Sequence, residues 1–185
     1  MLKNDQTIAI TALKILTKKK WSEVSLVEIK KKSLVKSFDK LVKNKNDVLI
    51  MINHYFDYKL SLISNNIEQS SNKDMIFEII MMRFDILQKN RKAIKSIFSS
   101  LQNKPNQLIC FLPEILDSII LMIASINISN KGIFDNLKVK GILIIYISSF
   151  LVWIKDESPS LEKTMTALDN YLNQGESILN FIKKS

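Results

Sequence analysis

The sequence predicts an all-α fold, and three observations support this prediction. Apolar residues recur three and four positions apart along most of the chain, which is the spacing of amphipathic helices. Only three glycines and three prolines occur in 185 residues, so there is little turn chemistry for a fold rich in β-strands. The stretch Leu137–Lys155 is the clearest single helix, because it is apolar and its residues 141–154 carry no charge.

This apolar stretch is too short to predict a membrane span. A spanning helix needs about 20 predominantly apolar residues, whereas the uncharged run has 14 and is flanked by Lys138, Lys140 and Lys155. We therefore expect a cytoplasmic protein without a transmembrane segment, in which this helix is buried in the core or against a second copy of the chain. The single cysteine, Cys110, cannot form an internal disulfide and is expected to be buried in a reducing compartment.

Basic charge is concentrated in the N-terminal third of the chain. Residues 1–60 contain 13 lysines and 6 acidic residues, whereas residues 61–185 contain 14 basic and 12 acidic residues. Such an excess is typical of a segment that binds nucleic acid. The alternative is a lysine-rich surface without such a partner, since lysine and asparagine are abundant throughout the chain.

The first 67 residues predict four helices. Residues 4–19 have one apolar face, and Trp21 follows them. Ser25 and Glu28 have the spacing of a capping box, which predicts a helix beginning at Leu26. A short helix is expected over residues 35–43, and Asn44 is placed to cap a long helix that continues towards residue 67.

This arrangement resembles the N-terminal domain of TetR-type transcriptional regulators over residues 5–60. The resemblance implies a TetR-like fold of about nine helices, with a helix-turn-helix domain over 1–48 and a ligand-binding and dimerisation domain over 49–185. In that family the third helix enters the major groove of DNA. The residues expected to contact DNA are Ser25, Lys30, Lys36, Ser37, Lys40, Lys43 and Lys45.

Two positions depart from the family pattern. Relatives usually have a glycine in the turn between the second and third helices and a tyrosine near the end of the third. This chain has no glycine in residues 31–38, and Asp39 stands at the tyrosine position, where phosphates would repel it. We therefore expect any DNA binding to be weak in sequence preference and steep in its dependence on salt.

The C-terminal two thirds predict an apolar ligand pocket. Residues 75–88 are apolar on most faces, and flexible thioethers suit a cavity of irregular shape. The candidate pocket residues are Met81, Met82, Phe84, Phe98, Phe111, Met122, Tyr146, Phe150 and Trp153. The alternative is that these side chains fill the core at ordinary packing density.

The last helix predicts a dimer interface. Ser158 and Pro159 have the pattern of an N-cap followed by a first helical residue. Apolar and small residues then recur at alternating spacings of four and three up to Leu179, as in a coiled coil. With Ile145 of the preceding helix, the expected interface comprises Ile145, Leu161, Met165, Leu168, Leu172 and Gly175. The alternative is a seam that packs only on its own chain.

A second resemblance covers residues 75–175. The residues that carry it are Met82, Arg83, Phe84, Asp85, Arg91, Trp153, Asp156, Ser158, Thr164, Leu168 and Asp169. They are similar to a pattern in TetR-like accessory proteins of ubiquinone biosynthesis. That resemblance implies a protein that has lost DNA recognition and binds an isoprenoid lipid or quinone precursor for a partner enzyme, a hydroxylase.

The residues that carry chemistry in enzymes form no recognisable constellation. His54 is the only histidine, and no cysteine and histidine residues have metal-ligand spacing. The three glycines are scattered, so no phosphate-binding loop is predicted. We expect a binding protein without cofactor or metal, not an enzyme. The basic N-terminal third favours a dimeric regulator that binds DNA and a small apolar ligand, whereas the altered turn favours the lipid-binding accessory protein; we place the regulator first.

Overall fold

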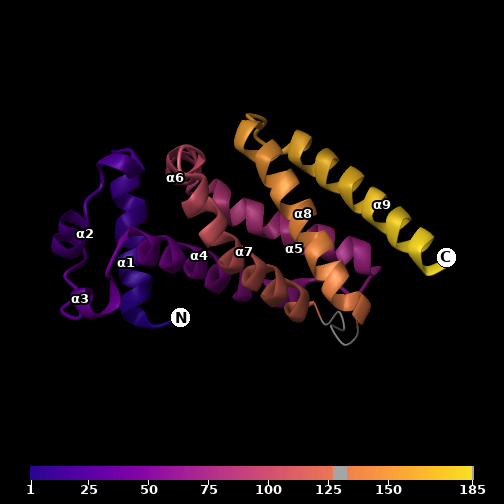
Figure 1. Cartoon of the computed structure of the whole chain (residues 1–185), viewed down its shortest axis with the longest axis horizontal. Coiled ribbons are helices and arrows are strands. Elements are labelled where there is room, and N and C mark those ends of the chain that lie inside the picture. Colours follow the sequence, from indigo (N-terminus) through magenta and orange to yellow (C-terminus); the bar gives the residue numbers. More distant parts are fainter. Residues whose placement is uncertain (127–132, 185) are drawn as a thin grey trace. The chain divides into compact units, whose positions relative to one another are not determined.

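The computed structural model describes residues 1–126 and 133–184, excluding the side chains of 133–136 and 178–184. The sequence predicts a loop over residues 127–132, and these residues lie outside this description. The described residues form nine α-helices and two short 3-10 helices, and the expected all-α class is confirmed (Figure 1). The elements are α1 Lys3–Leu16, η1 Trp21–Glu23, α2 Leu26–Ser33, α3 Phe38–Leu41, α4 Lys45–Ser61, η2 Ser64–Asn66, α5 Asn72–Gln88, α6 Arg91–Gln102, α7 Pro105–Ser125, α8 Ile133–Lys155 and α9 Glu162–Lys184.

The chain forms two compact units. The first contains Met1–Leu62 and Ile86–Ser118, and the second contains Ile63–Asp85 and the chain from Ile119 onward. Helices α5 and α7 therefore each contribute residues to both units. The expected domain boundary after residue 48 lies inside α4, and that division remains a prediction.

In the first unit, α1 is the central helix. It packs against α2, α4 and α6, and Figure 1 shows α2 and α3 beside it, with α4 leading away on its other side. The fully buried side chains include Ile8, Leu16 and Ile29, which supply the apolar contacts of this unit. A polar contact joins α4 to α7, where Asn53 Nδ2 donates to Ser118 Oγ at 2.8 Å. The hydroxyl of Ser118 in turn donates to Asp57 at 2.9 Å, so a buried amide and hydroxyl are both satisfied.

The cap of α2 is present as expected, but only half of the capping box forms. The Ser25 hydroxyl accepts from the Glu28 backbone N–H at 3.1 Å. The Glu28 carboxylate does not complete the box, because it accepts from Lys19 and Lys32. Hydrogen bonds from Lys32 and Lys19 hold the pKa of Glu28 below its ordinary value.

The third helix is shorter than expected. It covers only Phe38–Leu41, whereas the sequence pattern indicated a helix over 35–43. The flanking side chains Val35 and Val42 are nonetheless buried with Phe38, so burial fixes this segment although its ends are not helical. Asn44 caps α4 as expected, by accepting from the backbone N–H groups of Asn46 and Asp47.

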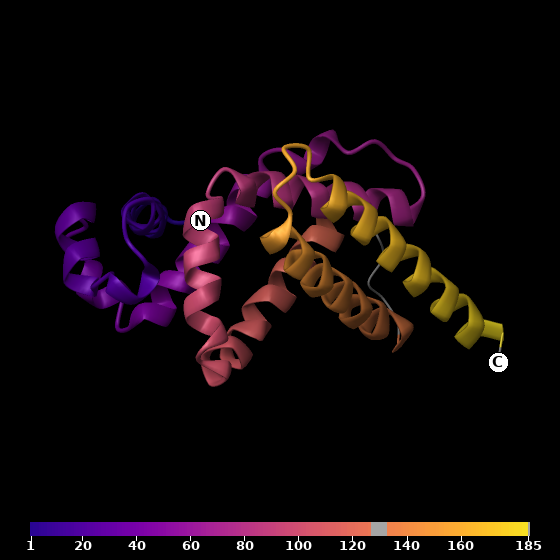
Figure 2. The same ribbon diagram turned by 90° about the horizontal axis from the view of Figure 1, so that it is seen from above.

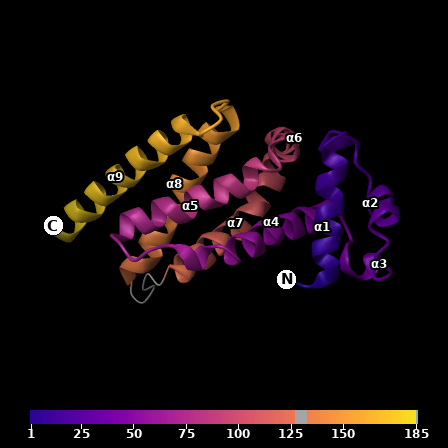
Figure 3. The same ribbon diagram turned by 180° about the vertical axis from the view of Figure 1, so that it is seen from behind.

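In the second unit, α8 and α9 form an antiparallel hairpin (Figures 2 and 3). Gly175 permits their close approach, since a Cβ there would lie 3.1 Å from the Ile145 side chain. Phe84 of α5 stacks on Tyr146 of α8, with ring centroids 5.5 Å apart, and on Trp153 at 6.2 Å. These three aromatic side chains are almost wholly buried, so the stack forms part of the core of the unit.

Three further expectations are wrong. Helix α4 ends at Ser61 and is followed by η2, so it does not reach residue 67. Helix α9 begins at Glu162, three residues after Pro159. Cys110 is exposed on α7, because apolar neighbours in the sequence do not by themselves bury a residue of a helix.

Among the described residues, Leu34 and Leu161 have a left-handed backbone, and they predict opposite effects of glycine substitution. Leu34 follows α2 with a φ of 56°, and its side chain is 84% exposed. A left-handed conformation costs a residue with a Cβ about 1–2 kcal/mol. We expect Leu34→Gly to raise the free energy of unfolding by roughly 1 kcal/mol, because it removes this strain and sacrifices no buried surface.

Leu161 provides the matched comparison. It has the same φ of 56°, but its side chain is only 2% exposed. Leu161→Gly should therefore lower stability by about 2 kcal/mol or more, because the loss of burial outweighs the relief of strain. Urea denaturation of both variants measures the two effects. Equal destabilisation by both substitutions would contradict the argument from strain at Leu34.

Candidate nucleic-acid interface

Helices α2 and α3 and the turn between them carry a cluster of exposed lysines. Lys36 and Lys40, two of the residues expected to bind DNA, are exposed on or beside α3, and Lys31 is exposed at the end of α2. Among the described contacts, none of these three ammonium groups has an ion-pair or hydrogen-bond partner. Three cations without a partner on one short segment are available to bind an anionic surface.

Other lysines of this segment are engaged within the chain. Lys30 forms an ion pair with Asp39, and the Lys43 ammonium donates to the backbone carbonyl of Asp39. Asp39, which the sequence indicated as repelling phosphate, is thus partly neutralised by Lys30. The pair is exposed, so its contribution to stability is small.

The remaining residues expected at the DNA interface have structural contacts. Ser25 caps α2, and the Ser37 hydroxyl accepts from Asn4 Nδ2 at 3.1 Å, which connects α1 to the α2–α3 segment. Lys45 lies elsewhere, with its ammonium donating to the Trp21 carbonyl at 2.8 Å and lying 5.1 Å from the centre of the Trp21 ring. The DNA contacts proposed for these residues remain predictions.

Because α3 has a single turn, it presents few side chains to a groove. A recognition helix of ordinary length reads base edges with three or four side chains along one face. Here Phe38 and Val42 are buried, and Lys36 and Lys40 are the exposed residues with charge to offer. Such a surface suits phosphate contacts better than base contacts, which agrees with the expected weak sequence preference.

The residues expected to form an apolar pocket fall into both compact units. Phe84, Tyr146, Phe150 and Trp153 form the aromatic stack of the second unit, where Phe150 and Trp153 are 5.5 Å apart. Arg83, which is buried, donates from Nε to the Tyr146 hydroxyl at 3.1 Å. Met81, Met82 and Met122 also lie in the second unit, whereas Phe98 and Phe111 lie in the first. None of the nine lines either of the two pockets discussed below, and the apolar ligand remains a prediction.

Three of the six residues expected at a dimer interface are buried within one chain. Leu161, Leu168 and Leu172 are at most 6% exposed, because the seam of α9 packs against α8. Ile145 lies over Gly175, and only Met165 is exposed among the six. Leu179 lies outside the residues whose side chains are described. The dimer interface through these six residues remains a prediction.

Asp156 organises the junction between α8 and α9. It is 1% exposed and accepts hydrogen bonds from the backbone N–H and hydroxyl of both Ser158 and Thr164. The Ser158 hydroxyl then accepts from the Glu162 N–H at 3.0 Å, so Ser158 still helps to cap α9. The resemblance to quinone-biosynthesis proteins was based in part on Asp156, Ser158 and Thr164. In this structure these residues form the hydrogen bonds that cap the start of α9.

Comparisons with known proteins support the fold. No protein-family model matches the chain, and no curated protein matches it significantly. Among solved structures, the chain is similar to the TetR transcriptional regulator from Nitrosomonas europaea ATCC 19718, with a TM-score of 0.69 and 18% sequence identity. The match covers 93% of this chain and 97% of that one. The protein therefore has an all-α, TetR-like fold; the resemblance to quinone-biosynthesis proteins receives no support from these comparisons.

Two stretches, Pro105–Ser125 and Leu137–Lys155, are long and apolar enough to cross a membrane. This is weak evidence of a span, because core helices of soluble proteins have the same length and composition. The expected absence of a transmembrane segment remains a prediction. In each stretch, 22% of the most apolar 18-residue window is buried within the chain.

The junction at Asp156 predicts a dependence of stability on pH. Burial alone would raise the pKa of the Asp156 carboxyl, but the hydrogen bonds from Ser158 and Thr164 outweigh burial and hold the pKa well below its ordinary value of 3.8. A depressed pKa in the folded state contributes stability that is present above the ordinary value and is lost as the pH falls below it. We expect Asp156→Asn to lower the free energy of unfolding at pH 7 by about 2–3 kcal/mol.

Urea denaturation between neutral and acidic pH measures this contribution. The difference between the wild type and Asp156→Asn should shrink as the pH falls below about 4, because the Asp156 carboxylate of the unfolded wild-type chain takes up a proton there, whereas the folded state keeps this carboxylate ionised. Asp117→Asn on the exposed face of α7 is the control and should leave the profile unchanged. A difference that stayed constant across this range would show that the charge of Asp156 is not what holds the junction.

Proposed function

We propose that this protein is a TetR-type transcriptional regulator that binds DNA as a homodimer and is not an enzyme. The observation that carries the proposal is the exposed lysine cluster on the α2–α3 segment of a TetR-like fold. The helix-turn-helix of such a fold is the element that contacts DNA. A cytoplasmic location is part of this proposal.

Phosphate contacts account for most of the affinity in this proposal. Lys31, Lys36 and Lys40 are exposed and lack acidic partners among the described contacts, so each can neutralise a phosphate. Every neutralised phosphate releases counterions, which makes binding weaker as salt increases. The single turn of α3 limits contacts with base edges, so affinity should depend little on sequence.

Neutralising two lysines of the cluster tests DNA binding. We expect Lys36→Gln combined with Lys40→Gln to weaken binding of a labelled duplex, and to make the plot of log K against log salt shallower by about 0.9 for each phosphate that is no longer neutralised. Fluorescence anisotropy at several salt concentrations measures both quantities. Lys89→Gln combined with Lys92→Gln, at exposed positions beside and on α6, makes the same change in net charge and is the control. Equal weakening by the two double variants would overturn the assignment of the α2–α3 surface.

The dimer is supported by an exposed apolar stripe on α8. Leu137, Ile144 and Leu151 are 47%, 65% and 45% exposed, and they are spaced seven residues apart. Residues at this spacing lie on one face of a helix, as in the seam of a coiled coil. Leu151 also borders a pocket of about 420 Å³ between α8 and α9, which could receive a side chain from a second copy. A second copy that covers this stripe would bury apolar surface that the single chain leaves in water.

Charge placed in this stripe should prevent dimerisation. We expect Ile144→Asp to convert the dimer to a monomer, because the substitution puts an unpaired carboxylate into a desolvated interface. Analytical ultracentrifugation at micromolar concentration measures the oligomeric state, and circular dichroism checks that the variant is folded. Leu121→Asp on α7, at a side chain that is 57% exposed, is the matched control and should remain dimeric. A wild-type protein that is monomeric at this concentration would contradict the proposal.

A further inference from the structure

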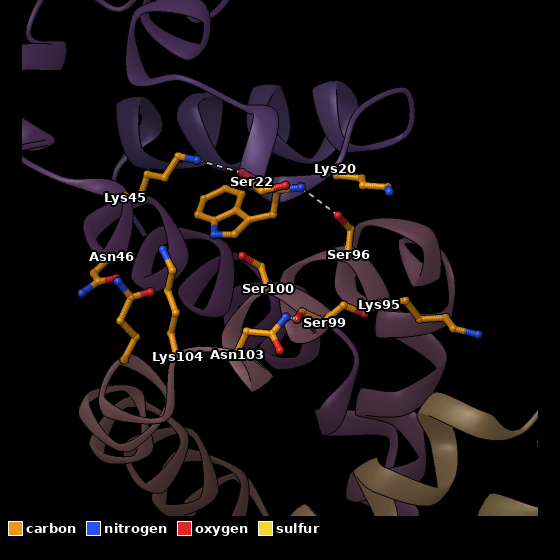
Figure 4. Close-up of a pocket in the computed structure, with 12 residues that line it drawn as sticks. Lys20, Ser22, Lys45, Asn46, Lys95, Ser96, Ser99, Ser100, Asn103 and Lys104 are labelled. Atoms are coloured by element: carbon orange, nitrogen blue, oxygen red, sulfur yellow. Dashed lines mark hydrogen bonds between the residues drawn. The ribbon is translucent and has the colours of Figure 1, made fainter.

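A polar pocket of about 710 Å³ lies entirely within the first compact unit. Its walls come from η1, the first turn of α4, α6, and the connection between α6 and α7 (Figure 4). The volume lies within the range of pockets that hold small molecules, which is about 300–1,000 Å³. This pocket is separate from the exposed lysines at Lys36 and Lys40, neither of which lines it.

Four lysines line the pocket, and no acidic residue is among the described residues that do so. They are Lys20, Lys45, Lys95 and Lys104. Figure 4 shows Lys45 and Lys104 on one side of the pocket, whereas Lys20 and Lys95 extend outward on the opposite side. A pocket with this lining concentrates positive potential and attracts anions.

Lys45 contacts neutral groups and another cation among the described contacts. Burial lowers the pKa of the Lys45 ammonium, and the charge of Lys104 lowers it further. The Lys45 ammonium donates to a neutral carbonyl, that of Trp21, and lies over the Trp21 ring. An anion between Lys45 and Lys104 would relieve the repulsion between these two cations.

The rest of the lining is rich in neutral hydrogen-bonding groups. Ser99 and Ser100 of α6 contribute hydroxyls, and Asn46 and Gln107 contribute amides. Ser96 accepts from the Trp21 N–H at 2.8 Å, and this bond joins η1 to α6 across the pocket. Hydroxyl and amide groups both donate and accept, so they suit a ligand that carries several hydroxyls.

We propose that this pocket binds a small sugar phosphate, with the phosphate at Lys45 and Lys104 and the sugar hydroxyls at the serines of α6. The site stands on the geometry of the first unit and does not depend on DNA binding. Because its walls include η1 and the start of α4 as well as α6, a bound ligand would connect the segment that precedes the helix-turn-helix to α6. The ligand would thereby hold the helix-turn-helix against the rest of its own unit.

Ribose 5-phosphate is the probe that tests the site. We expect it to bind the full-length protein saturably by isothermal titration calorimetry and to raise the melting temperature, because it binds only the folded state. Ribose should not bind measurably, and inorganic phosphate should bind more weakly than ribose 5-phosphate. Absence of saturable ribose 5-phosphate binding would overturn the site, and phosphate binding of equal strength would overturn the assignment to a sugar phosphate.

Two variants connect binding to the pocket. Lys104→Gln should weaken ribose 5-phosphate binding about tenfold or more, because it removes a charged hydrogen-bond donor. Without ligand, it should leave the melting temperature equal or higher, since it removes the repulsion of Lys45. Lys92→Gln, on the same helix as the serines but outside the pocket, is the control. Ser99→Phe should abolish binding by filling the pocket, and its site is exposed enough to accept the ring without unfolding.

DNA is the competing occupant of these lysines. If Lys104→Gln weakened DNA binding as much as ribose 5-phosphate binding, the pocket would belong to the DNA interface and the proposal would be wrong. If the wild type bound ribose 5-phosphate but no DNA, the proposed regulator function would fail and the sugar-phosphate site would be supported. Equal weakening of ribose 5-phosphate binding by Lys92→Gln and Lys104→Gln would show an effect of net charge alone and would overturn the site.

Discussion

The arrangement of the first unit depends on how Trp21 is held. Its side chain is 4% exposed, its backbone N–H donates to Ser96 of α6, and its carbonyl accepts from Lys45 of α4. One residue of η1 therefore connects three segments that are far apart in sequence. A buried backbone group without a partner costs free energy comparable to that of a hydrogen bond, so these contacts restrict η1 to one position. The α2 helix begins three residues after η1, and its placement follows from that restriction.

The second unit combines a buried seam with apolar side chains that are exposed on α8. Helices α8 and α9 bury the seam of α9 between them, and α8 is left with an exposed stripe on another face. Exposure of an apolar stripe to water is unfavourable in proportion to its area. The hydrogen bonds of Asp156 fix the connection between α8 and α9, and they do not involve the residues of the stripe. Packing within the chain and the proposed packing between copies therefore use different faces of α8.

The sequence predicted the fold well, because its strongest signals are local. Ser25 and Asn44 cap helices where the pattern placed them, since a cap depends on neighbours only two or three residues away. The TetR-like fold was also predicted, from the order of the N-terminal elements. The seam of α9 was assigned to a dimer, although Leu168 and Leu172 are buried in their own chain. Periodicity shows which residues share a face but not which surface covers that face. The predicted length of α3 was too great for a similar reason. The apolar residues Val35 and Val42 suggested a longer helix, but they are buried in segments that flank α3 and are not helical.

The polar pocket was missed because its residues are separated by more than 80 positions in the sequence. Lys20 and Lys45 contributed to the basic N-terminal third, which indicated a nucleic-acid surface, whereas Lys95 and Lys104 lie in a part of the chain with little net charge. The fold separates the lysines of the N-terminal third into at least two groups. One group faces outward from the α2–α3 segment, and the other lines a pocket together with Lys95 and Lys104. A count of charges along the sequence does not distinguish these two groups of lysines. Attraction of DNA requires lysines on an exposed surface, whereas binding of a small anion requires lysines around a pocket. The electrostatic signal for DNA binding therefore rests on the outward-facing lysines alone, and it is smaller than the composition of the N-terminal third indicates.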